Sequence, residues 1–576
     1  MAKSPVSGYQ ETGTNQAALF TLKVHRGEGM LLLGMNWKDA KPTLDFVGFS
    51  IEYKEPNGTK FFPLKNRINF PGADKTDPNV KFTIRSPLQL FRWVHFPRNA
   101  NMEGLFTYKV KPVFMNEKGE LSYGESQQCS IALARETYLN ELNVTFTRGF
   151  VSSQAFVDRY QEKGDIKTLL PDNSKEGLDF VPTHPLATEA LSWMGFEAYN
   201  AILQVLDDAI KDNGAKVCVI AYDLNEPEIV NRLKKLKKRL RIIIDNSKDH
   251  KEDGSAENKA EEILKITAGQ NQVIRQKMGS LQHNKIIIVD GPATKKVVCG
   301  STNLSWRGFF VQNNNAIILT GNSSVKVFNE AFENFWNVGE NNTVSLFNNT
   351  KSPTWQFLGL SNIDAKVTFS PHSGDNSVLQ SISDDIVTVK SSLLYSMAFL
   401  AQTGGPIRDA LTNITENNKI FVYGIADKPV GGIILKSTDG NPQPVSPAII
   451  STNIPQPFKK EPSGGGGIRM HHKFLVMDFN TPDARVYMGS YNFSGVADAS
   501  NGENLLLIKD RKIATSYMIE AVRIFDHYQF RLALSKADAK KQNLELTIPP
   551  KDKKQKPWWD KFYTDKRQIK DRELFS

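Results

Sequence analysis

The sequence predicts an α/β protein that carries an internal duplication and is preceded by an antiparallel β-sandwich. Short alternating or apolar runs, separated by Gly, Pro and Asn turns, fill the first quarter of the chain, as in a sandwich of short strands. After Pro182, strand-like and helix-like segments alternate, which is typical of layered α/β domains. A similar order of segments recurs from Val367. With 576 residues and 40% hydrophobic composition, the chain can bury the cores of two or three domains.

The sandwich is expected between Gln16 and about Arg135. Its clearest strands are Leu31–Trp37, Phe46–Tyr53 and Leu105–Phe114. The last of these runs into an Asn-Glu-Lys-Gly turn, and the resulting hairpin is similar to the final hairpin of a fibronectin- or immunoglobulin-like domain.

The later segments are assigned by their periodicity and length. The predicted helices are Glu197–Lys211, Glu228–Leu240 and Ile386–Leu400, and the predicted buried strands are Val217–Tyr222, Arg241–Asp245, Ile420–Ile425 and Phe474–Met477. Two segments rich in charge, Gly, Pro or Ser, Asn246–Glu262 and Ser437–Gly467, are expected to be surface loops, either of which could act as a lid. Within the second, Gly464–Gly467 is expected to be a flexible approach loop, because no Lys-Ser or Lys-Thr follows it.

One motif occurs twice. His283-x-Lys285-x4-Asp290 is followed by Gly300-Ser301-Thr302-Asn303, and His471-x-Lys473-x4-Asp478 is followed by Gly489-Ser490-Tyr491-Asn492 after a nearly equal gap. A single copy could arise by chance, but two copies with the same companion are very unlike chance.

The repeated residue types suit phosphodiester chemistry. Alternation along a strand puts the His and Lys of each motif on one face, so that they converge on one point. Cationic and neutral donors can then bind the nonbridging oxygens of a phosphodiester without a metal ion. One imidazole would attack phosphorus while the other protonates the leaving oxygen. The expected phosphate-binding residues are Lys285, Lys473, Ser301, Ser490, Asn303 and Asn492.

The alternative is that these histidines are ordinary buried residues beside structural aspartates, which is the better interpretation of any single His. His472 adds an ambiguity within the second motif, and the spacing to Lys473 and Asp478 selects His471. The duplication favours the catalytic interpretation.

The paired blocks and their surroundings resemble the phospholipase D superfamily from roughly Pro182 to the C-terminus. The resemblance implies two fused lobes with mixed sheets, related by a pseudo-two-fold axis so that the motifs face one another. It also implies that His283 is the nucleophile and that Asp290 and Asp478 are mainly structural. The expected domains are an accessory sandwich over 1–140, a first lobe over 141–350, and a second lobe over 351–576 that includes a basic aromatic tail.

The two halves differ at the position where a carboxylate is expected. Alignment of Asn303 with Asn492 places Glu503 opposite Asn314, where the family often has a carboxylate behind the catalytic imidazole. The hypothesis from this alignment is that Glu503 bonds His471 and favours its charged form, while Asn314 supports a neutral, nucleophilic His283.

The remaining features limit cofactors and partners. Cys129, Cys218 and Cys299 are far apart in mostly strand-like runs, which indicates reduced thiols and neither a disulfide framework nor a zinc site. No cofactor is expected. The net charge of +10 favours a polyanionic partner, either nucleic acid or an anionic lipid surface. The aromatic residues of the basic tail Lys551–Arg572 are expected to pack on the last lobe, with membrane docking or base stacking as alternatives.

Two substrate classes share this chemistry. A phospholipase D type activity on lipid head groups is preferred, because two motifs fused behind a β-sandwich resemble the layout of those enzymes. The alternative is a nuclease acting on DNA or RNA, with a role in defence, which the positive charge favours. An inactive binding module is a minor third possibility. No transmembrane segment is found; we expect a cytoplasmic protein, with peripheral membrane attachment left open, in which one chain suffices for one active site.

Overall fold

The computed structural model describes residues 8–576 except 75, 134–135, 150–155, 157–158, 342–343, 375–376, 401–403, 418, 427–434, 437–441, 444–469 and 553. Most of the expected loop Ser437–Gly467 therefore lies outside the described residues. The chain forms two compact units. One contains Met1–Arg135 and Thr515–Ser576, and the other contains Glu136–Lys436 and Pro442–Ala514.

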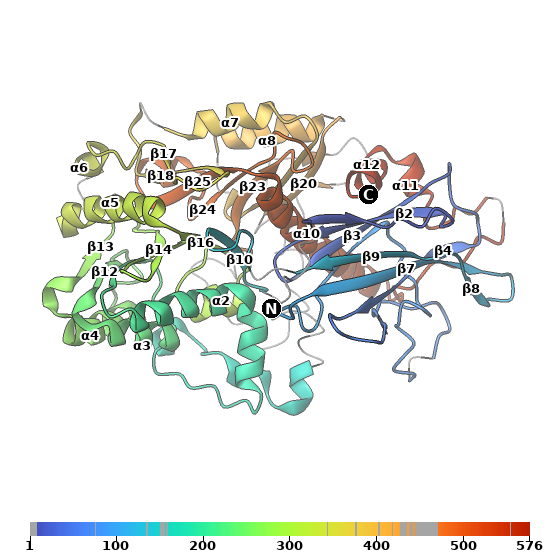
Figure 1. The fold of residues 1–576 in the computed structure, drawn as a ribbon, viewed down its shortest axis with the longest axis horizontal. Helices are drawn as coiled ribbons and strands as arrows, with labels where there is room; N and C mark the ends of the chain where they lie inside the picture. The colour runs from blue at the N-terminus through green and yellow to red at the C-terminus, as the bar shows by residue number, and fades with distance from the viewer. Residues whose placement is uncertain are drawn as a thin grey trace. The chain divides into compact units, whose positions relative to one another are not determined.

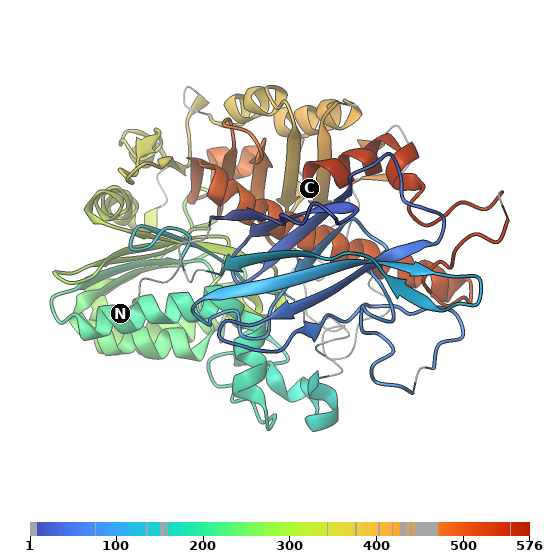
Figure 2. The same cartoon turned by 45° about the vertical axis from the view of Figure 1, so that its right-hand side comes forward.

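The first unit contains two antiparallel sheets, drawn in blue as two layers in Figure 2. Side chains from both sheets, such as Phe20, Leu33, Phe49 and Tyr108, share one apolar core, so the predicted β-sandwich is confirmed. One sheet has the order β1 (Gln10–Thr12), β2 (Phe20–Arg26), β3 (Leu31–Trp37), β6 (Arg92–His95). The other has the order β5 (Phe62–Pro63), β4 (Phe46–Lys54), β7 (Leu105–Met115), β8 (Leu121–Tyr123), with β9 (Gln127–Ala132) also paired to β7.

The basic aromatic tail belongs to this first unit, and the expectation that it packs on the second lobe is wrong. Trp559 and Phe562 are buried in the sandwich core, and the Trp558 indole donates to the carbonyl of Phe46 at 3.0 Å. The buried rings of Trp559 and Phe562 are consequently not available for a membrane surface or for stacked bases. The helices of this region are most of α10 (Arg511–Ala539), α11 (Lys561–Thr564) and α12 (Lys566–Leu574).

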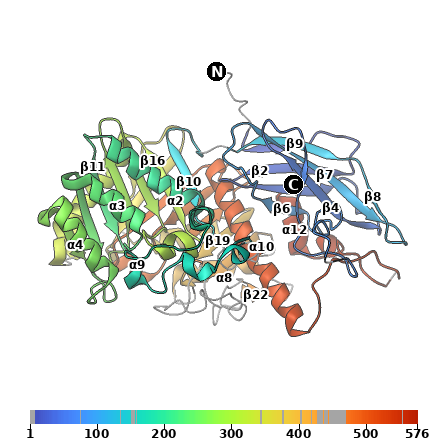
Figure 3. The ribbon, with the colours of Figure 1, turned by 90° about the horizontal axis from the view of Figure 1, so that it is seen from below.

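The second unit contains two seven-stranded mixed sheets. In the first sheet the order is β10 (Leu142–Phe146), β16 (Asn315–Thr320), β15 (Lys295–Gly300), β14 (Lys285–Asp290), β11 (Lys216–Ala221), β12 (Leu240–Asp245), β13 (Val273–Gln276). Helices α2 (Ala187–Lys211), α3 (Pro227–Leu236) and α4 (Ala256–Ala268) cover one face, as the view from below shows (Figure 3). Helix α5 (Asn322–Val338) lies on the other face, toward the second sheet (Figure 1).

The second sheet repeats the order of the first. It runs β17 (Gln356–Phe357), β18 (Asp364–Ser370), β25 (Glu503–Lys509), β24 (Arg485–Gly489), β23 (Lys473–Met477), β19 (Ser392–Met397), β20 (Phe421–Ala426). In both sheets the motif strand, β14 or β23, is antiparallel to a central strand that in turn pairs parallel with the next one. The internal duplication and the two mixed-sheet lobes are thus confirmed.

Further short elements complete the unit. They are α6 (Val344–Asn348), α7 (Leu379–Val387), α8 (Pro406–Glu416), α9 (Gly495–Ala499), β21 (Leu435–Lys436), β22 (Pro442–Gln443), the π-helical turn η7 (Arg307–Val311), and the 3₁₀ turns η2 (Gln161–Lys163), η3 (Ile166–Leu169), η4 (Ser174–Glu176), η5 (Lys237–Arg239), η6 (Gln270–Gln272) and η8 (Gly339–Asn341).

One predicted helix is wrong. The segment Ile386–Leu400 contains the end of α7 and then β19, all six residues of which are buried. A central strand that is covered on both faces has a continuous apolar run, and such a run cannot be distinguished from a buried helix by its periodicity.

Candidate active site

The two motif histidines meet in the second unit. His283 directly precedes the motif strand of one lobe, and His471 precedes that of the other. Their ring centroids are 6.4 Å apart, with the planes inclined at 70°. Both residues are about 95% buried. The rings are therefore close enough for one tetrahedral phosphoryl group to contact both.

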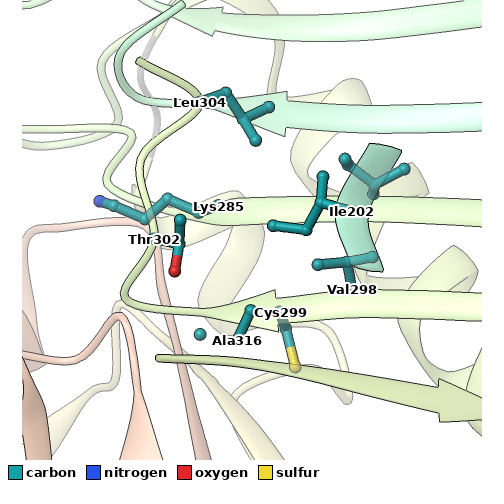
Figure 4. Close-up of a pocket in the computed structure, with 9 residues that line it drawn as sticks. Ile202, Lys285, Val298, Cys299, Thr302, Leu304 and Ala316 are labelled. Atoms are coloured by element: carbon teal, nitrogen blue, oxygen red, sulfur yellow. The ribbon is translucent and has the colours of Figure 1, made fainter. Parts of the chain in front are cut away.

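The two motif lysines lie beside these rings. Lys473 Nζ is 3.1 Å from His471 Nε2 and donates to the carbonyl of His471 at 2.9 Å. Lys285 Nζ donates to the carbonyl of His283 and lies 4.6 Å from the centre of the Tyr222 ring. The stem of Lys285 lines a small cavity with Ile202 and Val298, and its ammonium group points away from them (Figure 4). This cavity belongs to the apolar core of the first lobe.

Backbone bridges connect each motif to the opposite lobe. Gln282, before the first motif histidine, forms a parallel bridge with Gly502, and Met470, before the second, forms one with Asn313. Gly502 N donates to Leu281 O at 2.8 Å in the first of these contacts. Each histidine therefore lies beside the start of a strand of the other lobe, His283 near β25 and His471 near β16.

This crossing corrects the predicted pairing of Glu503. Its Oε2 atom lies 3.1 Å from Nδ1 of His283, and not beside His471. Asn314 Oδ1 instead lies 2.8 Å from Nδ1 of His471. The alignment had matched the positions correctly but assumed that each lobe supplies the partner for its own histidine. The bridges exchange the partners between lobes.

The motif serines also differ from the prediction that they bind phosphate. The Ser301 hydroxyl donates to Asn314 Oδ1 at 3.0 Å, and that of Ser490 bonds the Glu503 carboxylate. Since a hydroxyl has only one hydrogen to donate, both groups are used behind the imidazoles. In this arrangement the two hydroxyls lie beside the partners of His283 and His471, and a role in binding phosphate stays a prediction.

The motif glycines allow close approach of the neighbouring strand. Gly300 has φ 142° and Gly489 has φ 154°. A Cβ at Gly300 would lie 2.5 Å from the carbonyl oxygen of Asn315, and one at Gly489 would collide with the carbonyl of Asn504. Only glycine fits these positions without moving the sheet. The close approach of the neighbouring strand holds in place the serine and asparagine that follow each glycine.

The two motif asparagines differ in burial and in their hydrogen bonds. Asn303 is buried, and its amide nitrogen donates to Asp223 at 2.7 Å, which leaves one N–H for another acceptor. Asn492 is half-buried. Among the described residues, the amide oxygen of each lacks a hydrogen-bond partner.

The motif aspartates lie at the far ends of their strands from the histidines. Asp478 is buried and accepts from the backbone N–H groups of Lys390 and Ser391 at 3.0 and 2.7 Å, which anchors the start of β19. Asp290 is more exposed and contacts Lys295 and Asn329. His472 lies 3.3 Å from the Asn315 amide.

Burial controls the charges of the site. Burial and the ammonium groups of Lys285 and Lys473 lower the pKa of His283 and of His471 well below the usual range. Burial also lowers the pKa of Lys285 to about 7, against the opposing effect of Glu503. Burial raises the pKa of Glu503 to about 8, with Lys285 acting against it. An anionic phosphodiester between the two lysines would favour the charged forms of lysine and imidazole.

A second group of polar residues was not predicted. His250 lies between Asp223, at 3.1 Å from Nε2, and Asp245, at 2.7 Å from Nδ1. The Tyr222 ring contacts both the His250 and the His283 rings edge to face. The sequence did carry a signal, because Asp223 and Asp245 follow or end two predicted strands. The composition of Asn246–Glu262 predicts a surface loop, whereas His250 within it is buried.

Among the described residues, Asp223, His250 and Glu257 form the group with spacing closest to a metal site, with side-chain ligand atoms all within 4.8 Å of one another. Both ring nitrogens of His250 face carboxylates, however, and hydrogen bonds to these carboxylates outweigh burial and raise the pKa of His250 to about 11. The imidazolium therefore occupies the position that a cation would take. The three cysteines are free thiols.

Comparison with known families identifies both lobes. The family described as "Cardiolipin synthase, PLD-like domain" matches residues 206–336 and 390–525, which contain the two motifs. The chain belongs to the phospholipase D superfamily. A protein named phospholipase D from Rickettsia prowazekii is 44% identical over 48 residues, which are 8% of this chain and 22% of that protein. The chain thus matches about a fifth of the length of this superfamily member.

Solved structures that are similar to this chain have lower sequence identities. Phosphatidylserine synthase from Haemophilus influenzae is 12% identical with a TM-score of 0.40, over 66% of this chain and 93% of that one. A phospholipase D family member, Nuc from Salmonella typhimurium, is 26% identical with a TM-score of 0.21, over 24% of this chain and 89% of that one. Within the described part of the chain, no helix has the length and apolar character needed to span a bilayer.

Proposed function

We propose that this protein is a phosphodiesterase that acts through a covalent phosphohistidine, with phospholipase D type activity on phospholipid head groups. The observation that carries the proposal is the pair of imidazoles 6.4 Å apart, one from each lobe. Each ring has Nδ1 against an oxygen atom, of Glu503 or of Asn314. With Nδ1 placed there, the Nε2 atoms are the ones proposed to react, and Nε2 of His471 lies 3.1 Å from Lys473 Nζ.

His283 is the proposed nucleophile. Its Nε2 attacks phosphorus, and the bond from phosphorus to the leaving oxygen breaks as that oxygen takes a proton from His471. In the second step His471 takes a proton from water or an alcohol, whose oxygen attacks phosphorus and releases His283. Lys285 and Lys473 offset the charge of the nonbridging oxygens in both steps. These cations perform the role that a metal ion has in other phosphodiesterases.

The corrected pairing changes the reason for this assignment. A carboxylate behind His283 would make that ring the more basic one, and that alone would suggest that it is the acid. The phosphorylated ring, however, carries a positive charge while its Nδ1–H is retained, and Glu503 offsets this charge in a site without bulk water. The acid has to release its proton, and the neutral acceptor Asn314 holds an imidazolium less strongly.

The preferred substrate is a phospholipid. Two motifs fused in one chain behind a β-sandwich resemble the layout of phospholipases D, and the matched relative from Rickettsia is named phospholipase D. The alternative is a nuclease that cleaves DNA or RNA, which the net charge of +10 favours. An inactive module is disfavoured because both motifs retain His, Lys and Asp.

The test uses one purified protein on several substrates. Wild type and His283→Ala are incubated, with EDTA present, with phosphatidylcholine vesicles, plasmid, single-stranded DNA and RNA. We expect wild type to release head group from the vesicles and the variant to release none. Cleavage of nucleic acid alone would support the nuclease instead, and no cleavage of any phosphodiester by wild type would refute the proposed function.

A further inference from the structure

The first half of the site is supported by three linked polar side chains, Asp223, Asp245 and His250. Asp245, at the end of β12, accepts from the backbone N–H of Gln282 at 2.7 Å, directly before His283. Asp223, after β11, accepts from the amide of Asn303 at 2.7 Å. The imidazole of His250 joins the two carboxylates, with 3.1 and 2.7 Å between the paired atoms.

The side chains of His250 and Asp245 are buried and are held in place by further contacts. His250 is 91% buried, and Asp245 is fully buried. Asp245 Oδ2 also accepts from the N–H of Ser247 at 2.8 Å, which fixes the turn that carries His250. Of the charged groups that face the ring, Asp223, Asp245 and Glu257 are all acidic. A cation between two carboxylates satisfies both, and a neutral replacement would leave them repelling each other.

Among the described residues, the opposite lobe lacks a counterpart of Asp223. The strand registers match Ala221 with Met397, since each pairs with its motif lysine. Counting on, Tyr222 corresponds to Ala398 and Asp223 corresponds to Phe399. The carboxylate of the first lobe is therefore replaced by an aromatic ring in the second, on the side of His471.

We propose that His250 is a positioning residue that ties together the two ends of the first half-site. Through Asp245 it holds the backbone just before His283. Through Asp223 it holds the amide of Asn303, and Tyr222 transmits its position to the His283 ring by edge-to-face contacts of 4.6 and 4.7 Å. The role in turnover rests on the proposed function. It requires that the nucleophile be held more rigidly than the acid, because a small displacement from phosphorus lowers the rate of attack steeply.

The test compares His250→Gln with His184→Gln. His184 is also a buried histidine of the second unit, but among the described residues its ring hydrogen-bonds backbone atoms of Tyr160 and Leu186 and lies edge to face with the Tyr160 ring. With bis(4-nitrophenyl) phosphate as a generic phosphodiester, we expect His250→Gln to lower kcat by about 100-fold with little change in KM, and His184→Gln to keep wild-type kinetics. Asp245→Asn should have a similar effect, and the double variant should lose about as much as either single one, because the residues act as a unit.

A second measurement does not depend on turnover. In protein labelled with ¹⁵N-histidine, both ring nitrogens of His250 should carry protons from pH 6 to 9, and His250→Gln should shift the ring signals of His283 while His184→Gln should not. If the wild type proves inactive but His283 shifts in this way, the proposed function fails and the positioning role stands. If His250→Gln leaves both kcat and the His283 signals unchanged, or if the losses of the single variants multiply, the positioning role is refuted.

Discussion

At the level of single side chains, the site depends on what lies behind each imidazole. Glu503 lies behind His283 and Asn314 behind His471, and a serine hydroxyl orients each partner. A carboxylate and an amide have similar shapes but differ by one charge. The two histidines can therefore differ in function although their motifs are the same.

Replacement of Glu503 by Gln keeps the shape and removes the charge that the carboxylate would carry opposite a phosphorylated His283 ring. We expect kcat to fall by about 10³-fold or more, in the range seen when the carboxylate behind a catalytic imidazole becomes an amide, with the formation of the covalent intermediate slowed. Rapid-quench kinetics with a chromogenic phosphodiester measures this step. Glu226→Gln is the control, since Glu226 is also buried in the second unit but bonds Tyr199. Equal activity of the two variants would rule out a role for the Glu503 charge.

The buried Lys285 is expected to lower the free energy of unfolding of the protein. Burial lowers its pKa from 10.5 to about 7 in the folded protein, so the folded state holds the proton less tightly than the unfolded state. The destabilising effect is fully present below pH 7 and disappears as pH rises toward 10.5. Lys285→Met should abolish activity and raise the Tm at pH 6 to 7, at about 2–4 °C for each kcal/mol gained. Calorimetry at pH 6 and pH 10 should show a smaller gain at the higher pH, and a gain that grows with pH would contradict this assignment.

At the level of strands and bridges, the sequence predicted most elements but not how the lobes meet. Strands β11, β12, β20 and β23 were predicted from short apolar runs, and β19 was taken as a helix because its burial on both faces removes the alternation. The exchange of Glu503 and Asn314 between lobes depends on two isolated bridges between distant residues. No local pattern encodes such a bridge, so the residue types of the site were predictable and their pairing was not.

The bridge at Gly502 offers a direct test of this geometry. A Cβ there would lie 2.9 Å from the amide carbon of Gln282, a fully buried side chain. Gly502→Ala should displace Gln282, cost about 1–3 kcal/mol by overpacking, and lower kcat by at least about 10-fold, because His283 follows directly. Gly495→Ala, in α9 with open space around it, should retain activity. Urea unfolding and kinetics measure both effects, and an active Gly502→Ala would show that the bridge does not position the histidine.

At the level of the whole chain, the duplication and the sandwich were predicted, whereas the position of the tail was not. The aromatic residues of the tail fit the sandwich core as well as any other apolar surface by composition, and only the tertiary structure decides between them. The division between lobes near residue 350 stays a prediction, since both lobes fall in one compact unit. Both proposed catalytic histidines come from one chain, so we expect a monomer to suffice for one site.

Mixing inactive variants tests whether one chain is enough. His283→Ala and His471→Ala each lack one of the two proposed catalytic imidazoles. If both lobes of a site belong to one molecule, neither variant can supply the imidazole that the other lacks. We expect no activity from the mixture, and a specific activity of wild type that does not change on dilution. Recovery of activity in the mixture, after co-refolding as well as simple mixing, would show that the sites form between chains.

The decisive measurement is the location of phosphorus in the trapped intermediate. Enzyme quenched during turnover of a phosphodiester is digested under alkaline conditions that preserve phosphohistidine, and the peptides are sequenced by mass spectrometry. We predict one phosphoryl group per chain, on His283. Phosphorus on His471 would reverse the roles of nucleophile and acid, and the absence of any phosphohistidine in turning-over enzyme would exclude the covalent mechanism.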